Sequence, residues 1–312
     1  MAKVVSMINW KGGVGKTTAT LNIGVGLAKF QEFGKSNVLL VDLDPQTNLS
    51  YSSMGIDDYI EWAYTNKKST LKDLYDDYLN NKSDFDVNDA LVKDAIKSTS
   101  NVHLLPSHLD LIFIDMKLAR KREGSTELES MAGEELKKLS ILSNIFKEIE
   151  ENYDYIICDC PPNFNLVTQN AIFASEAFII PALPDFLSTV GMQQIVHEVS
   201  NLNKRVRKYI ALYDEKIEYI DTELKGIIFT RVKEHGGMPK ESHRYTINRV
   251  KNEFEGKVFG DGDKYIIDGD GLVKASDSFL PIYDYARTYN LPVADKQAKQ
   301  YKECTEEFFN KV

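Results

Sequence analysis

The sequence predicts an α/β fold in which helices flank a doubly wound, mostly parallel sheet. Three observations predict it: apolar, β-branched runs alternate with longer helical patterns, a glycine-rich turn joins the first run to the first helix, and two later runs end in aspartate. The chain has 312 residues, 43% of them hydrophobic, and is therefore long enough to bury a large core. We expect a single domain over residues 1–312, with a helical insertion at about 52–100.

The alternation of apolar runs and helical patterns predicts the strands and helices in order along the chain. Strands are expected at 4–8, 38–42, 102–105, 155–159, 177–181 and 225–229. Helices are expected at 17–30, across 109–150, at 165–174, 189–208 and 240–254, and from about 294. The polar, Tyr- and Asp-rich stretch at 52–100 interrupts this rhythm and is interpreted as an inserted helical layer, for example around 71–79. The Gly-Asp segments at 260–263 and 268–271 indicate turns.

Composition limits where the protein acts. The N-terminus lacks the features of a secretory signal, and no apolar run approaches the roughly 20 residues that span a bilayer. Cys158, Cys160 and Cys304 make neither a disulfide framework nor a C-x-x-C site. These observations favour a cytoplasmic protein.

The charge distribution leaves two interpretations open. A net charge of −9 argues against a polyanionic partner, yet residues 225–251 hold seven Lys or Arg and only two acidic residues. A second basic run lies at 204–208. These clusters are either solvated helix faces or a surface for DNA phosphates. The candidates for DNA contact are Lys204, Arg205, Arg207, Lys208, Arg231, Lys233, Arg244 and Arg249.

Residues 10–18 read Trp-Lys-Gly-Gly-Val-Gly-Lys-Thr-Thr and lie between a predicted strand and a predicted helix. Glycines let backbone N–H groups curl toward phosphate oxygens, and the helix that follows presents its positive end to the same anion. Lys16 then reaches the β- and γ-phosphates and Thr17 offers a hydroxyl to Mg²⁺. We expect an ATP site formed by Gly12, Gly13, Val14, Gly15, Lys16, Thr17 and Thr18.

Carboxylates follow two of the predicted strands. One strand runs into Asp42 and Asp44, and the other ends at Asp159. Asp159 is the candidate that holds Mg²⁺, through water, beside Thr17. Alternation along an extended strand places Asp42 and Asp44 on the same side, where one orients the attacking water and the other supports the metal shell or the backbone.

Together these motifs resemble the ParA/MinD-type P-loop ATPases, and more closely the ParA partition branch. The segment 11–18 matches their deviant Walker A motif, in which the residue before the first lysine is commonly not glycine. In this chain that residue is Trp10. Asp42-Leu43-Asp44-Pro45-Gln46 and the stretches 104–107, 153–162 and 181–191 also follow the family pattern.

The resemblance implies roles for individual residues. Lys11 would be the signature lysine that reaches the phosphates bound by the other subunit of an ATP-sandwich dimer. Asp44 would be the switch I carboxylate of hydrolysis, and Asp159 the switch II aspartate near Mg²⁺. By family position, Arg231 and Pro281 would lie near adenine.

The expected function is that of an Mg²⁺-dependent ATPase for plasmid or chromosome segregation. By resemblance, an ATP-dependent homodimer binds nonspecific DNA and a centromere-binding ParB-type partner stimulates its release. The protein would then be cytoplasmic and nucleoid-associated when bound to ATP. The alternative is a MinD-like positioning ATPase, which would require a basic amphipathic C-terminal helix; residues 294–312 instead balance Lys against acidic residues.

Overall fold

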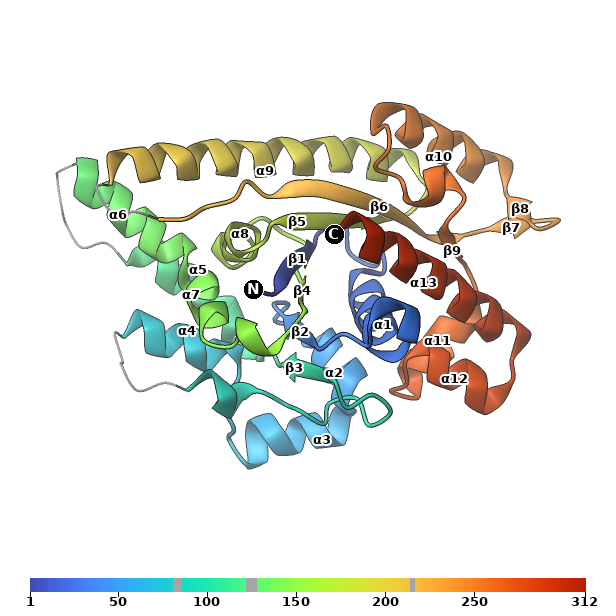
Figure 1. Cartoon of the computed structure of the whole chain (residues 1–312), viewed down its shortest axis with the longest axis horizontal. Coiled ribbons are helices and arrows are strands. Elements are labelled where there is room, and N and C mark those ends of the chain that lie inside the picture. The colour runs from blue at the N-terminus through green and yellow to red at the C-terminus, as the bar shows by residue number, and fades with distance from the viewer. Residues whose placement is uncertain (81–85, 122–127, 214–216) are drawn as a thin grey trace.

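The computed structural model describes residues 1–80, 86–121, 128–213 and 217–312. Parts of the predicted insertion and of the predicted helices at 109–150 lie outside these residues. A seven-stranded sheet of order β3-β2-β4-β1-β5-β6-β9 runs through the centre, and all of its strand pairs are parallel (Figure 1). Its strands are β1 (Lys3–Met7), β2 (Val38–Asp42), β3 (Val102–Leu105), β4 (Tyr155–Asp159), β5 (Ala177–Ala182), β6 (Glu223–Val232) and β9 (Tyr265–Ile267).

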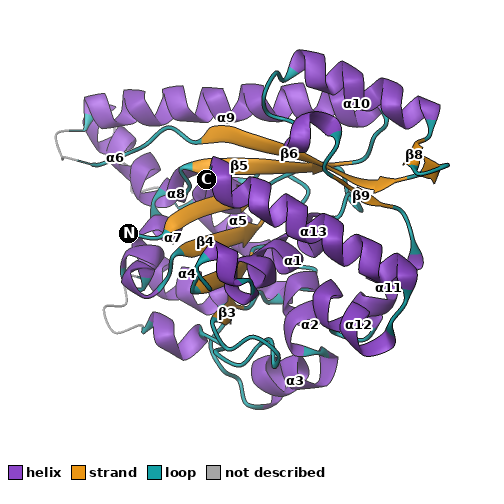
Figure 2. Cartoon of the chain, turned by 45° about the vertical axis from the view of Figure 1, so that its right-hand side comes forward, coloured by secondary structure: helices purple, strands orange, loops and turns teal. Residues whose placement is uncertain are grey.

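Helices cover both faces of the sheet, as Figure 2 shows. They are α1 (Lys16–Lys29), α2 (Asn48–Met54), α3 (Ile56–Ile60), α4 (Leu71–Leu79), α5 (Ile112–Arg120), α6 (Leu128–Leu139), α7 (Ile141–Lys147), α8 (Leu166–Ala174), α9 (Phe186–Leu212), α10 (Glu241–Glu253), α11 (Asp270–Asp277), α12 (Ile282–Tyr289) and α13 (Pro292–Lys311). The predicted doubly wound α/β fold is confirmed. The helices predicted at 17–30, 165–174 and 240–254 agree with α1, α8 and α10 to within two residues.

The strands bury alternate side chains in two apolar cores. Val4 and Leu39 belong to the core shared with α8 and α9, whereas their neighbours Val5 and Leu40 belong to the core shared with α1 and α13. Because both faces are covered, β2 and β4 are apolar up to the aspartate that ends each of them, rather than alternating with polar residues. This arrangement leaves the carboxyl edge of the sheet as the place for polar groups.

Several elements of the last third of the chain were not predicted. They are the short strand β9, the hairpin of β7 (Glu234–His235) and β8 (Met238–Pro239), and the helices α11 and α12. The prediction of a turn throughout 268–271 was wrong, because Asp270 and Gly271 begin α11. At 260–263 the structure does have a tight turn, in which Gly260 and Asp261 adopt left-handed φ values of 55° and 54°.

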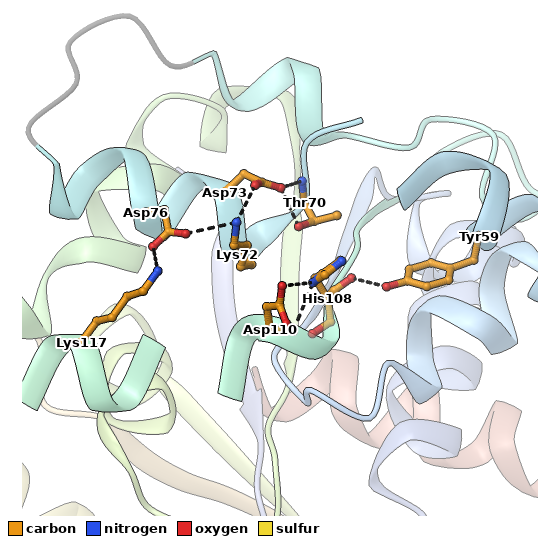
Figure 3. Close-up of polar contacts among 9 residues, drawn as sticks. Tyr59, Thr70, Lys72, Asp73, Asp76, His108, Asp110 and Lys117 are labelled. Atoms are coloured by element: carbon orange, nitrogen blue, oxygen red, sulfur yellow. Dashed lines mark hydrogen bonds and ion pairs between the residues drawn. The ribbon is translucent and has the colours of Figure 1, made fainter. Parts of the chain in front are cut away.

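Side-chain contacts fasten the helices of the 52–100 region to the sheet and to α5. The hydroxyl of Tyr59 on α3 donates to the carbonyl oxygen of Ser107, which follows β3, at 2.8 Å. Lys117 of α5 forms an ion pair with Asp76 of α4 (Figure 3). Buried Tyr75 and Leu74 of α4 belong to the same apolar core as α8 and α9. We propose that this region is an insertion of the one domain rather than a separate unit.

Candidate functional site

The turn between β1 and α1 carries the predicted phosphate site (Figure 1). Gly13 and Gly15 have φ values of 71° and 81°, in the left-handed region that glycine adopts without strain. Gly15 is also the N-cap of α1, and as a glycine it has no side chain that could bond to the first N–H groups of the helix. The first N–H groups of α1 therefore remain available to an anion, as a phosphate cradle requires.

Lys16 lies over this turn with only 7% of its surface exposed. Its Nζ donates to the carbonyl oxygen of Lys11 at 3.4 Å. Burial lowers the pKa of Lys16, while the nearby carboxylates of Asp159 and Asp44 oppose that shift. A poorly solvated cation beside open N–H groups attracts an anion strongly.

The side-chain oxygens of Thr17 and Asp159 lie within hydrogen-bond distance of each other near Lys16. The Thr17 hydroxyl donates to Oδ2 of Asp159 at 2.6 Å, whereas the buried Oδ1 of Asp159 has no hydrogen-bond partner. Burial raises the pKa of Asp159 to about 7, although Thr17 and Lys16 oppose that rise. A buried, unsatisfied carboxylate oxygen next to a hydroxyl fits a hard cation that completes its shell with water and phosphate. No group of three His, Cys, Asp or Glu able to hold a metal exists among the described residues.

Asp42 and Asp44 do not share one side of a strand as predicted. Strand β2 ends at Asp42, so alternation does not extend to Asp44 in the loop that follows. Asp42 is fully buried and accepts hydrogen bonds from the N–H and the hydroxyl of Ser50 and from the N–H of Asp44. Burial raises the pKa of Asp42 to about 8, and the negative charge of Asp159 adds to that shift. Asp42 thus anchors α2 and the loop, while Asp44 faces the cavity described next.

A cavity of about 930 Å³ extends from the phosphate turn toward the C-terminal part of the chain. Residues 12–18 and Asp44 line one part of it, and residues between 266 and 277 line another part, which is called the far wall below. The size suits a nucleotide. This wall was not predicted from the sequence. Its local signal is the β-branched pair Ile266-Ile267 at the end of the short strand β9, followed by Asp-Gly.

The two residues predicted near adenine are placed differently. Arg231 lines the cavity, has a left-handed φ of 52°, and its Nε lies 3.5 Å from a carboxylate oxygen of Asp268 on the far wall. Pro281 is the N-cap residue of α12 and is not among the residues that line the cavity.

Lys11 points away from the phosphate turn of its own chain. Its Nζ forms an ion pair with Asp185, the residue that caps α9, at 2.6 Å. The buried amide of Asn9 accepts from the Lys11 N–H at 2.9 Å and donates to the carbonyl oxygen of Pro181 at 2.8 Å, which positions the Lys11 backbone. Burial alone would raise the pKa of Asp185, but hydrogen bonds from Lys11 and from the Ser188 N–H outweigh it, and the net shift is downward.

The basic residues form two groups at different ends of α9. Arg244 and Arg249 lie exposed on α10, which packs beside the start of α9, where the Arg249 guanidinium lies 5.0 Å from the centre of the Phe186 ring. Lys233 lies exposed between β6 and the β7–β8 hairpin. Lys204, Arg205, Arg207 and Lys208 occupy the far end of α9. There Arg207 pairs with Asp221 at 2.8 Å and Arg205 donates to Gln169.

The apolar face of the C-terminal helix is buried in the protein. In α13 the buried side chains, including Tyr301, Cys304 and Phe308, pack in the core that α1 and α12 share. None of the helices in the described part of the chain is both long and apolar enough to cross a bilayer.

Known proteins match most of the length of this chain. Residues 2–212 match the family described as AAA domain. The sporulation initiation inhibitor protein Soj of Bacillus subtilis is 30% identical over 261 residues, which are 83% of this chain and 83% of Soj. The chromosome partitioning protein ParA of Caulobacter vibrioides is 29% identical over 223 residues, which are 69% of this chain and 71% of ParA.

Solved structures share the fold at lower identity. An ATP complex of a McdA variant from Cyanothece has a TM-score of 0.70 at 18% identity and covers 98% of this chain and 96% of its own. A plasmid partition protein from Borrelia burgdorferi bound to AMPPNP has a TM-score of 0.68 at 19% identity over the full length of both chains. Cobyrinic acid a,c-diamide synthase from Mycobacterium smegmatis, with ADP and magnesium, has a TM-score of 0.60 at 22% identity, covering 93% of this chain and 97% of its own.

Proposed function

The chain belongs to the ParA-type partition ATPases, and from this membership we propose that it segregates plasmid or chromosomal DNA in a cycle driven by ATP. In this cycle ATP joins two chains into a sandwich dimer, the dimer binds DNA without sequence preference, and a ParB-type partner stimulates hydrolysis and release. The protein would work in the cytoplasm, and on the nucleoid when bound to ATP. Slow intrinsic turnover follows, because hydrolysis acts as a timer.

ATP and Mg²⁺ are the nucleotide and the metal of the site. Nucleotides occupy McdA and the Borrelia partition protein, and magnesium accompanies ADP in the synthase. In this chain the turn at 12–18 would hold the phosphates, with Lys16 facing their outer oxygens, and Thr17 with the unsatisfied Oδ1 of Asp159 would hold the metal through water. When bound, Mg²⁺ supplies positive charge to the phosphate oxygens.

The proposal of an ATP-dependent dimer rests on the direction of the Lys11 side chain. Lys16 already covers the phosphate turn, and the Lys11 side chain extends to Asp185 instead of toward it. A second lysine at the same turn adds little to phosphate binding in its own chain, because it points outward. We propose that Lys11 leaves Asp185 when a second subunit approaches and then binds the nucleotide of that subunit.

Asp44 is proposed to orient the attacking water. It lines the cavity next to the phosphate turn, and its N–H is held by Asp42, which is anchored to Ser50. Its own Oδ1 accepts from the Gln46 N–H at 2.9 Å, which positions the carboxylate in the loop. A rigidly held carboxylate beside the terminal phosphate is suited to aligning water for in-line attack.

For DNA we propose the α10 group as the main contact, with the run on α9 as a second one. Arg244 and Arg249 are exposed on one helix, and Lys233 lies beside its start. Arg231, which was also a candidate for DNA, is assigned to the nucleotide, since it lines the cavity and pairs with Asp268. Exposed cations without carboxylate partners attract phosphate oxygens regardless of base sequence.

The test is a titration of two unrelated DNA duplexes with ATP, with ADP and without nucleotide, followed by fluorescence anisotropy. The proposal expects tight binding with ATP only, equal for both duplexes and weakened by salt. Equal binding in all three nucleotide states, or a strong preference for one duplex, would count against it.

A further inference from the structure

The C-terminal helix α13 supports the far wall of the nucleotide cavity. It packs against β9, α11 and α12 (Figure 2). Gln297 on this helix is fully buried. Its Nε2 donates to the carbonyl oxygens of Ile267 at 3.0 Å and Gly269 at 3.3 Å, and its Oε1 accepts from the Leu272 N–H at 3.0 Å. One amide thereby binds three backbone groups of the wall and uses both of its donors.

The wall lies directly against the helix. A Cβ atom at Gly271 would come within 2.3 Å of Oε1 of Gln297 and within 2.9 Å of the backbone of Ala294. A second amide, Gln300, accepts from the Ile267 N–H at 3.0 Å. Beyond Asp268, whose N–H donates to Val232, the wall leaves the sheet, and Gln297 supplies the hydrogen bonds that join it to α13.

This wall is where the nucleoside of ATP would lie. The phosphate turn takes the triphosphate, so the base and ribose contact the remaining lining of the cavity, much of which is formed by residues between 266 and 277. Leu272 and Val273 offer apolar surface to the base, and Asp268 and Asp270 offer carboxylates to hydroxyl or amino donors.

We propose that Gln297 is a positioning residue for ATP, which holds the 267–272 wall at the distance that the nucleoside needs. The proposal rests on the proposed function, namely that the cavity binds ATP. It separates two parts of nucleotide affinity: the phosphate part is set by the turn at 12–18, and the nucleoside part is set through α13.

The experiment compares ATP with inorganic tripolyphosphate, both with Mg²⁺, by titration calorimetry on the full chain. Gln297→Met removes the three hydrogen bonds at similar volume. The matched control is Asn203→Leu on α9, because Asn203 is another buried amide that holds a loop, bonded to the Thr222 carbonyl oxygen at 3.1 Å and to the Tyr219 hydroxyl at 2.6 Å, and it does not line the cavity.

Gln297→Met is expected to weaken ATP binding on the order of tenfold and to leave tripolyphosphate binding within about twofold of wild type. Asn203→Leu is expected to lower the melting temperature without changing either affinity. In turnover, KM for ATP should rise for Gln297→Met with kcat unchanged. Gln300→Met, which removes one bond to the same wall, should shift the ratio of the two affinities in the same direction by a smaller factor.

The inference would be overturned if Gln297→Met had the same ratio of ATP affinity to tripolyphosphate affinity as the wild type, even if the variant had a lower melting temperature. If Gln297→Met does not fold, an unchanged ratio in Gln300→Met overturns it. Failure of the wild-type chain to bind ATP would instead refute the proposed function itself, and the inference with it.

Discussion

The side-chain nitrogen of Lys11 lies 2.6 Å from a carboxylate oxygen of Asp185, a residue 174 positions further along the chain. Each side chain is 39% exposed. The contact joins the turn that follows β1 to the residue that caps α9, so the proposed signature lysine is held within its own subunit. Opening this pair is a cost of dimerisation in the proposed cycle.

Asp185→Asn should therefore favour the ATP-dependent dimer. Asparagine keeps the hydrogen bond that caps α9 at Ser188 but loses the charge that holds Lys11. Exposed ion pairs contribute up to about 1 kcal/mol each, and a symmetric dimer opens one in each subunit, so the dimerisation constant should rise by up to about thirtyfold. Sedimentation across a range of protein concentrations measures it. Asp221→Asn, which breaks the exposed pair with Arg207, is the control and should leave the dimerisation constant unchanged. A weaker dimer in Asp185→Asn would refute the idea that Asp185 holds Lys11 back from the other subunit.

Asp44→Ala should keep ATP and magnesium binding while the ATPase rate falls roughly 100-fold, because water loses its orienting group. The ATP-bound dimer then accumulates. Phosphate release measures the rate. Asp57→Ala, at an exposed acidic residue of the nearby α3, should keep the wild-type rate. Full activity in Asp44→Ala would remove Asp44 from the mechanism.

The buried carboxyl of Asp42 predicts how stability depends on pH. Its folded pKa of about 8 lies well above that of an unfolded aspartate, so the folded state holds a proton that the unfolded state releases. Stability is then greatest below about pH 4 for this group and falls as pH rises toward 8, by up to about 1.4 kcal/mol per pH unit. Asp159, with a pKa of about 7, acts in the same direction.

Urea unfolding of the nucleotide-free protein between pH 6 and 8.5 tests this dependence. Asp42→Asn removes one of the two titrating groups, so its free energy of unfolding should fall less steeply with pH than that of the wild type. Parallel pH profiles for the two proteins would show that Asp42 is ionised in the fold throughout this range.

Charge reversal at Arg244 and Arg249 should weaken the binding of all duplexes alike and leave ATP affinity unchanged. The wild-type salt dependence should have a log–log slope near −0.9 per phosphate contacted, and the variant should have a shallower one. Reversal of Lys204 and Lys208 changes the net charge by the same amount at the other end of α9. Anisotropy with both variants distinguishes direct DNA contact by α10 from a general effect of net charge. An equal loss of DNA affinity in the two variants would show that α10 is not the main contact.

The turn that carries the candidate phosphate site could be predicted from the sequence because its residues are contiguous. Glycines, Lys16 and Thr17 follow one strand, and an aspartate that ends an apolar strand marks Asp159 without knowledge of the topology. The role that the resemblance implies for Asp44 stays a prediction. The expectation from alternation that Asp42 and Asp44 share one side of a strand was wrong, because the strand ends at Asp42.

The far wall and the Lys11 partner could not be predicted in the same way. The wall combines a three-residue strand, an eight-residue helix and a buried amide on α13, and none of these carries a periodic pattern long enough to detect. The contact between Lys11 and Asp185 depends on β1 and β5 being neighbours in the sheet, which is a property of topology and not of local sequence.

The central claim is that Lys11 acts in the other subunit, and sedimentation velocity of Lys11→Ala with ATP tests it most directly. Lys16→Ala serves as the reference that fails to bind ATP, since it lacks the cation over the phosphate turn. We expect Lys11→Ala to bind ATP in calorimetry like the wild type but to sediment as a monomer with ATP, whereas the wild type sediments as a dimer. A normal ATP-dependent dimer of Lys11→Ala, or loss of its ATP affinity as in Lys16→Ala, would contradict it.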